Sequence, residues 1–107
     1  MTIEAIAKEL QEEGLTPSRS SELRTWLAGQ YYFVSAELEG ILGQKPPLWN
    51  QMRKDLKSDT ATERAWEETE WGLLEMKCRS QLKAMDKMMS ALSSRIRVAE
   101  GEARNTF

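Results

Sequence analysis

The sequence predicts an all-α fold, and three observations lead to that prediction. Every apolar pattern repeats at spacings of three and four residues, which is the period of a helix rather than of a strand. No segment shows the alternation of β-branched or aromatic residues with polar ones that a strand needs. With 107 residues, 40% of them hydrophobic and 30% charged, the chain suits a single helical domain over 1–107.

The first two helices are expected at 2–13 and 21–42. Gly14 follows the first of them at the position that a C-terminal cap prefers, and Pro17 then separates the two. Gly43 ends the second helix. Its apolar stripe has steps of three and four and consists of Leu23, Leu27, Tyr31, Val34, Leu38 and Ile41.

A short third helix is expected at 47–57, opened by a proline, and a long fourth helix at 60–103. Thr60 and Glu63 have the spacing of a capping box at its start. No proline interrupts this segment, and whether Gly72 bends it stays open. Unbroken, it would measure about 65 Å, too long for its own small chain to cover.

The downstream part of the fourth helix has a heptad pattern typical of a coiled coil. We expect this coiled-coil-like helix to pair with helix 21–42, and its excess length to be solvated, broken or buried against another molecule. A second apolar row beside the heptad residues widens the face. The predicted self-association interface consists of Cys78, Leu82, Met85, Met88, Met89, Leu92, Ile96 and Ala99.

Charge is divided along the same helix. Residues 61–77 carry five acids and two bases, whereas residues 78–99 carry five bases and one acid. This division matches the helix dipole, and it would also place unlike charges opposite each other in an antiparallel pair. Alternatively, the basic half contacts nucleic acid, through Arg79, Lys83, Lys87, Arg95 and Arg97.

Composition argues against several other functions. The chain has no histidine and a single cysteine, which removes histidine-based catalysis, disulfide frameworks and cysteine-cluster zinc sites. We therefore expect no enzyme activity, no metal and no cofactor. The 15 basic and 17 acidic residues give a net charge of −2. No apolar run is long enough to span a membrane and the N-terminus is not typical of a signal peptide, so a cytoplasmic location is expected.

Residues 62–105, TERAWEETEWGLLEMKCRSQLKAMDKMMSALSSRIRVAEGEARN, place an acidic, aromatic half-helix before a basic half. This segment resembles the C-terminal region of small helical accessory proteins of bacteriophages and prophages, a family without an assigned function. The resemblance implies a phage-encoded protein that acts in the bacterial host cytoplasm. Together with the apolar pattern, it suggests a non-enzymatic adaptor that forms a homo-oligomer, a dimer or higher, and possibly binds another protein. The alternative is a nucleic-acid-binding accessory factor of phage replication or recombination.

Overall fold

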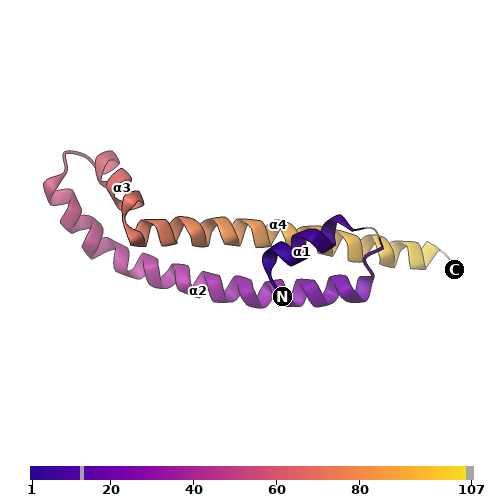
Figure 1. The fold of residues 1–107 in the computed structure, drawn as a ribbon. Coiled ribbons are helices and arrows are strands. Elements are labelled where there is room, and N and C mark those ends of the chain that lie inside the picture. The colour runs from indigo at the N-terminus through magenta and orange to yellow at the C-terminus, as the bar shows by residue number, and fades with distance from the viewer. Residues whose placement is uncertain (13, 106–107) are drawn as a thin grey trace. The chain divides into compact units, whose positions relative to one another are not determined.

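The structure is a computed structural model that describes residues 1–12 and 14–105 (Figure 1). These residues contain no strand, which confirms the all-α prediction, and the long C-terminal helix packs against other helices as expected. The helices are α1 (Ile3–Gln11), α2 (Pro17–Asp55), α3 (Asp59–Glu68) and α4 (Glu70–Asn105).

The chain divides into two compact units. Unit 1 consists of Met1–Tyr32 and Lys83–Phe107, so it contains α1, the start of α2 and most of α4. Unit 2 is Phe33–Leu82 and contains the rest of α2, all of α3 and the start of α4.

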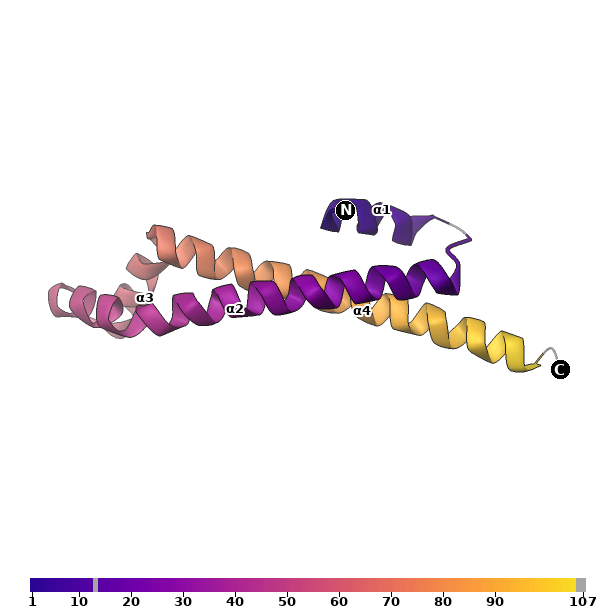
Figure 2. The ribbon, with the colours of Figure 1, turned by 90° about the horizontal axis from the view of Figure 1, so that it is seen from below.

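Unit 1 has an apolar interior. Figure 2 shows α1 beside the first part of α2, where the guanidinium of Arg19 donates to both carboxylate oxygens of Glu9, at 2.7 and 2.9 Å. Arg24 of α2 donates to the hydroxyl of Ser93 in α4 at 3.4 Å. Between these polar contacts five apolar side chains are fully buried, namely Ile6, Leu23, Leu27, Met85 and Leu92.

Both ends of the connection between α1 and α2 differ from the prediction. α1 ends at Gln11, whereas the predicted helix ran to residue 13, which lies outside the described residues. Gly14 has a φ of +85°, a conformation that glycine adopts without strain. α2 begins at Pro17 rather than at residue 21, because the hydroxyl of Thr16 caps it and proline is favourable at a first helical position.

Pro46 and Pro47 lie inside α2, so the predicted helices 21–42 and 47–57 are one helix. Proline inside a helix costs about 3 kcal/mol, which is why the sequence favoured a break. Contacts made by residues on either side of the two prolines offset this cost. The Lys45 ammonium and the Trp49 indole N–H both donate to the carboxylate of Glu63 in α3, at 3.1 and 2.9 Å.

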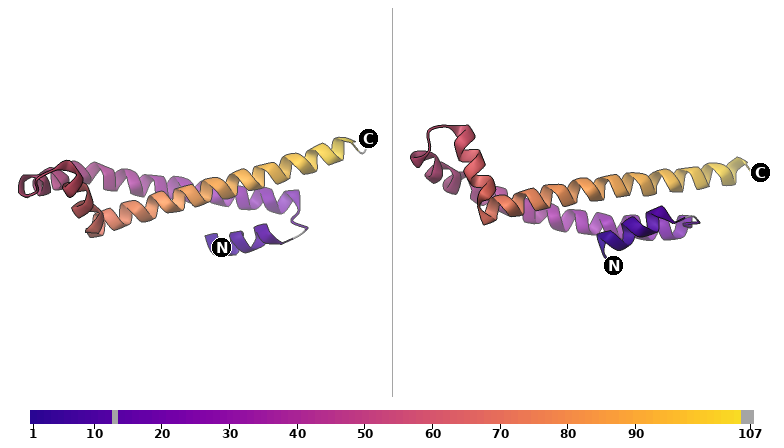
Figure 3. Two further views of the ribbon diagram at one scale, coloured as in Figure 1. Left: turned by 90° about the horizontal axis from the view of Figure 1, so that it is seen from above. Right: turned by 45° about the horizontal axis from the view of Figure 1, so that its top comes forward.

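The predicted helix 60–103 is also divided differently. Figure 3 shows α3 joining the end of α2 to the start of α4. Ser58, not Thr60, caps α3, since the Ser58 hydroxyl accepts from the Ala61 N–H at 3.1 Å. The helix is interrupted at Thr69, whose backbone is extended and whose hydroxyl accepts a hydrogen bond from the Gly72 N–H at 3.1 Å. The break therefore precedes Gly72 by three residues.

Gly72 permits the close approach of α4 to the last turn of α3. A Cβ atom at this position would lie 1.9 Å from the carbonyl oxygen of Trp66 and 2.8 Å from the Cα of Glu67. No side chain can occupy that space, because non-bonded atoms do not approach so closely. The sequence predicts Gly72 as a possible bend in one long helix. In the structure, the missing side chain at Gly72 lets α4 approach the last turn of α3 directly after the break at Thr69.

Candidate functional site

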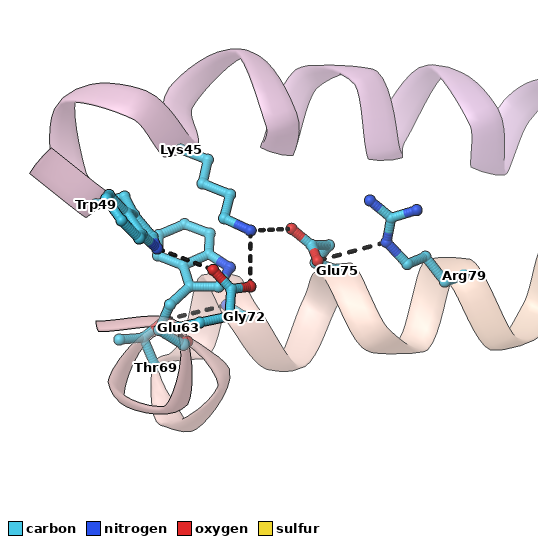
Figure 4. Close-up of polar contacts among 8 residues, drawn as sticks. Lys45, Trp49, Glu63, Thr69, Gly72, Glu75 and Arg79 are labelled. Atoms are coloured by element: carbon cyan, nitrogen blue, oxygen red, sulfur yellow. Dashed lines mark hydrogen bonds and ion pairs between the residues drawn. The ribbon is translucent and has the colours of Figure 1, made fainter. Parts of the chain in front are cut away.

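Unit 2 contains a group of linked polar side chains, which we call the lysine–carboxylate cluster: Lys45, Trp49, Glu63, Glu75 and Arg79 (Figure 4). Glu75 is buried, Lys45 is half-buried and Arg79 is exposed. The Lys45 ammonium donates to Glu63 at 3.1 Å and to Glu75 at 3.3 Å, so one cation links α2 to both α3 and α4. The ammonium also lies 5.4 Å from the ring centre of the buried Trp66, within range of a cation–π interaction.

The contacts within the cluster favour the charged states of Lys45 and Glu63. Burial lowers the pKa of Lys45, but the hydrogen bonds that its ammonium donates to Glu63 and Glu75 outweigh this effect, and the pKa is raised overall. The bond from Lys45 lowers the pKa of Glu63. A catalytic lysine needs a lowered pKa and a general-acid glutamate needs a raised one. The cluster is therefore suited to holding three helices together rather than to proton transfer.

Cys78 has the properties of a core residue. Its side chain is buried, and burial together with the charge of Glu37 raises the pKa of its thiol. A reactive thiol needs an accessible, electropositive setting that lowers this pKa. Among residues 1–12 and 14–105, no group of three His, Cys, Asp or Glu residues could hold a metal ion.

The start of α4 has an inverted polarity, in which the charged residue is inside and the apolar ones are outside. Glu75 is only 8% exposed, whereas Leu73 is 56%, Leu74 39% and Met76 50% exposed. Leu73 and Met76 each precede a buried residue by two positions, so they lie about 160° around the helix from the interior. We call residues 71–76 the apolar segment. Exposed large apolar side chains in such density are typical of interaction sites.

A hollow of about 300 Å³ opens beside the apolar segment. Trp71, which is 38% exposed, forms one wall, and the carboxylate of Asp55 lies at the same hollow. Its volume suits a few apolar side chains rather than a large cofactor. The complete lining consists of Leu48, Gln51, Met52, Asp55, Trp66, Thr69 and Trp71.

The structure divides the residues of the predicted self-association interface between interior and surface. Cys78, Met85 and Leu92 are buried by their own chain, since the heptad pattern faces α2. Five others are partly buried: Leu82, Met88, Met89, Ile96 and Ala99. Large apolar side chains that are more exposed lie elsewhere: Tyr32 is 76% and Phe33 70% exposed, and Leu73 in the apolar segment is 56% exposed.

The predicted basic residues also differ in their surroundings. Arg79 pairs with Glu75 at 3.4 Å, and the Arg95 guanidinium donates to the carbonyl oxygen of Leu10. The other three basic side chains are exposed, namely Lys83, Lys87 and Arg97. Arg79 belongs to unit 2 and the others to unit 1.

Sequence analysis missed Lys45 as a central residue because its partners are 18 and 30 positions away in the chain. The exposure of Leu73 and Leu74 did have a signal. Glu75 interrupts the heptad pattern at the one place where apolar residues surround the whole helix. Such a helix usually needs cover on every side.

The fold and this surface define the chain as an all-α protein with an uncovered apolar segment. No helix in the described part of the chain combines the length and apolar character needed to cross a membrane. No protein-family model, curated protein or solved structure matches the chain.

Proposed function

We propose that this protein is a non-enzymatic helical adaptor that self-associates and binds other proteins through helix packing. The observation that carries the proposal is the inverted polarity of the apolar segment, with Glu75 buried and Leu73 exposed. Burying apolar surface yields about 25 cal/mol per Å², so covering this segment with another helix would drive assembly.

The raised pKa of Lys45, the lowered pKa of Glu63 and the raised pKa of the Cys78 thiol support a structural role for these three groups. A bacterial cytoplasmic setting and a phage or prophage origin remain part of the proposal, and they rest on the resemblance of residues 62–105. The heptad residues of α4 that are only partly buried, such as Met88 and Met89, would extend the contact surface in unit 1.

The test compares two matched substitutions on α4 by light scattering over a range of concentrations. Leu73→Gln should lower the average mass towards that of a 12.3 kDa monomer, since Leu73 is exposed within the chain's own fold. Val98→Gln, at another residue that is more than half exposed, should leave the mass unchanged. A wild-type chain that stays monomeric and binds no protein through the apolar segment contradicts the proposal.

The alternative is a nucleic-acid-binding accessory factor, and the exposure of Lys83 and Lys87 favours it. Binding to phosphates releases counterions, so retention on DNA should fall steeply with salt. Combined Lys83→Glu and Lys87→Glu substitutions should abolish retention and leave the solution mass unchanged. Absence of retention at low salt would exclude this alternative.

A further inference from the structure

The order of charges around the apolar segment determines which kind of helix can cover it. Glu70 precedes the segment and Lys77 follows it, and both side chains are exposed. Seven residues correspond to nearly two turns, so Glu70 and Lys77 lie about 20° apart around α4. By the same geometry Leu73 and Leu74 lie midway along the helix between Glu70 and Lys77. Leu73 lies on one side of the line that joins Glu70 to Lys77, and Leu74 lies on the other.

This face, made of Glu70, Leu73, Leu74 and Lys77, is complementary to itself in one orientation. When two copies are placed antiparallel about a two-fold axis between Leu73 and Leu74, the Glu70 of each copy faces the Lys77 of its partner. A two-fold interface uses the same surface twice, so a single acid and a single base provide two attractive pairs. In a parallel arrangement, like charges would meet instead.

Neither charge has an ion-pair partner in the described side chains. Among residues 1–12 and 14–102, Glu70 and Lys77 form no ion pair, whereas the neighbouring Glu75 and Arg79 pair with each other. Leu73 and Leu74 expose 56% and 39% of their surface at the centre of the same face. An apolar centre between two unpaired, opposite charges is the arrangement expected of a small specific interface.

We propose that a second copy of this chain covers the face, as an antiparallel two-fold pair of α4 helices centred on Leu73 and Leu74, with Glu70 of each copy paired to Lys77 of the other. The pairing rests on the proposed function, because it specifies the surface and the orientation of self-association. It places the contact on the side of α4 that faces away from the buried Glu75.

The test is a charge exchange on the full-length chain, followed by sedimentation equilibrium at low salt. Glu70→Lys and Lys77→Glu should each weaken dimerisation by about tenfold or more, because each converts two attractive pairs into two repulsive ones. The combined variant should restore it. Matched controls are Glu39→Lys and Lys54→Glu, which change the same charges at exposed positions of α2 in unit 2 and should have no effect.

Mixing separates an interface effect from a folding defect. Glu70 lies in the first turn of α4, where replacing it by a base also weakens the helix. An equimolar mixture of the two single variants should nevertheless dimerise as well as the wild type, since each now offers the charges that the other lacks.

The outcomes distinguish this pairing from self-association in general. A wild-type dimer that neither single variant weakens overturns the antiparallel pairing but keeps the proposed function. A wild-type chain that is monomeric throughout overturns the pairing and the self-association together, even where a different protein occupies the face. Singles that are weakened and not restored by mixing also overturn the pairing.

Discussion

In unit 1 the interior consists of apolar side chains, with Leu27, Met85 and Leu92 fully buried and charges at the periphery. In unit 2 the buried Glu75 and the half-buried Lys45 lie beside a core of apolar residues, while Leu73 and other apolar residues are exposed. The buried apolar residues of unit 2 are Val34, Ile41, Trp66 and Cys78. Both units are built from parts of the same two long helices. Both units therefore have an apolar core, but unit 2 adds ion pairs to it and leaves more large apolar side chains exposed.

The ion pairs of unit 2 have a physical consequence. Lys45 attracts two carboxylates, but placing charges out of water carries a cost that offsets much of this attraction. Ion pairs fix geometry through direction and distance, and apolar contacts do not. The cluster therefore fixes the position of α3 against the part of α2 that contains Pro46 and Pro47. Part of the apolar surface of unit 2 stays exposed.

The largest expected effect comes from Gly72, where unit 2 has its closest contact between helices. Gly72→Ala should destabilise the protein by about 4 kcal/mol or more, because the added methyl group would overlap the Trp66 carbonyl. Chemical denaturation measures this. Gly29→Ala in unit 1 is the control, since its Cβ would meet nothing within 4 Å, and it should stabilise α2 by about 0.5–1 kcal/mol. Equal effects at both glycines would contradict the described contact.

Leucine truncation compares the two units directly. Leu92→Ala in unit 1 should cost about 2–5 kcal/mol in denaturation experiments, since it removes a fully buried side chain. Leu73→Ala in unit 2, measured at a concentration where the chain is dissociated, should cost less than about 0.5 kcal/mol. A large cost at Leu73 under these conditions would mean that the chain itself covers this residue.

A smaller effect should appear at acidic pH. Lys45 lowers the pKa of Glu63 in the folded state, so Glu63 contributes stability above its unfolded pKa of about 4.3 and loses that contribution as pH falls through the folded value. Glu63 is 44% exposed, and the contribution should be about 1 kcal/mol or less. Unfolding of wild type and Glu63→Gln should therefore differ at pH 7 and converge at pH 3. Glu67→Gln, at an exposed residue of α3, should show no such difference.

The sequence predicted the helical class, the buried stripe from Leu23 to Ile41 and the packing of the long C-terminal helix, because these follow from local periodicity. It did not predict that α2 continues through Pro46 and Pro47. Proline disfavours a helix locally, and the compensating contacts come from Glu63, a residue in another helix. It also placed the possible bend at Gly72 rather than Thr69, since the steric role of Gly72 exists only once α3 and α4 meet.

The surface was harder to predict than the fold. The heptad spacing correctly marked a packing face, and that face is partly used by α2, with Cys78, Met85 and Leu92 buried. Glu75 interrupts the heptad pattern. Its burial depends on Lys45, which no local pattern connects to it, so the sequence signals the exposure of Leu73 and Leu74 through that interruption alone.

The central claim is that the exposed leucines of unit 2 become covered by another molecule, whereas the exposed Val98 of unit 1 does not. Methyl NMR with a soluble paramagnetic agent tests this claim most directly. As protein concentration rises, the Leu73 and Leu74 methyl signals should lose their paramagnetic broadening, while those of the exposed Val98 in unit 1 keep theirs. Equal broadening of all three residues at every concentration, with or without candidate partner proteins, would contradict the account.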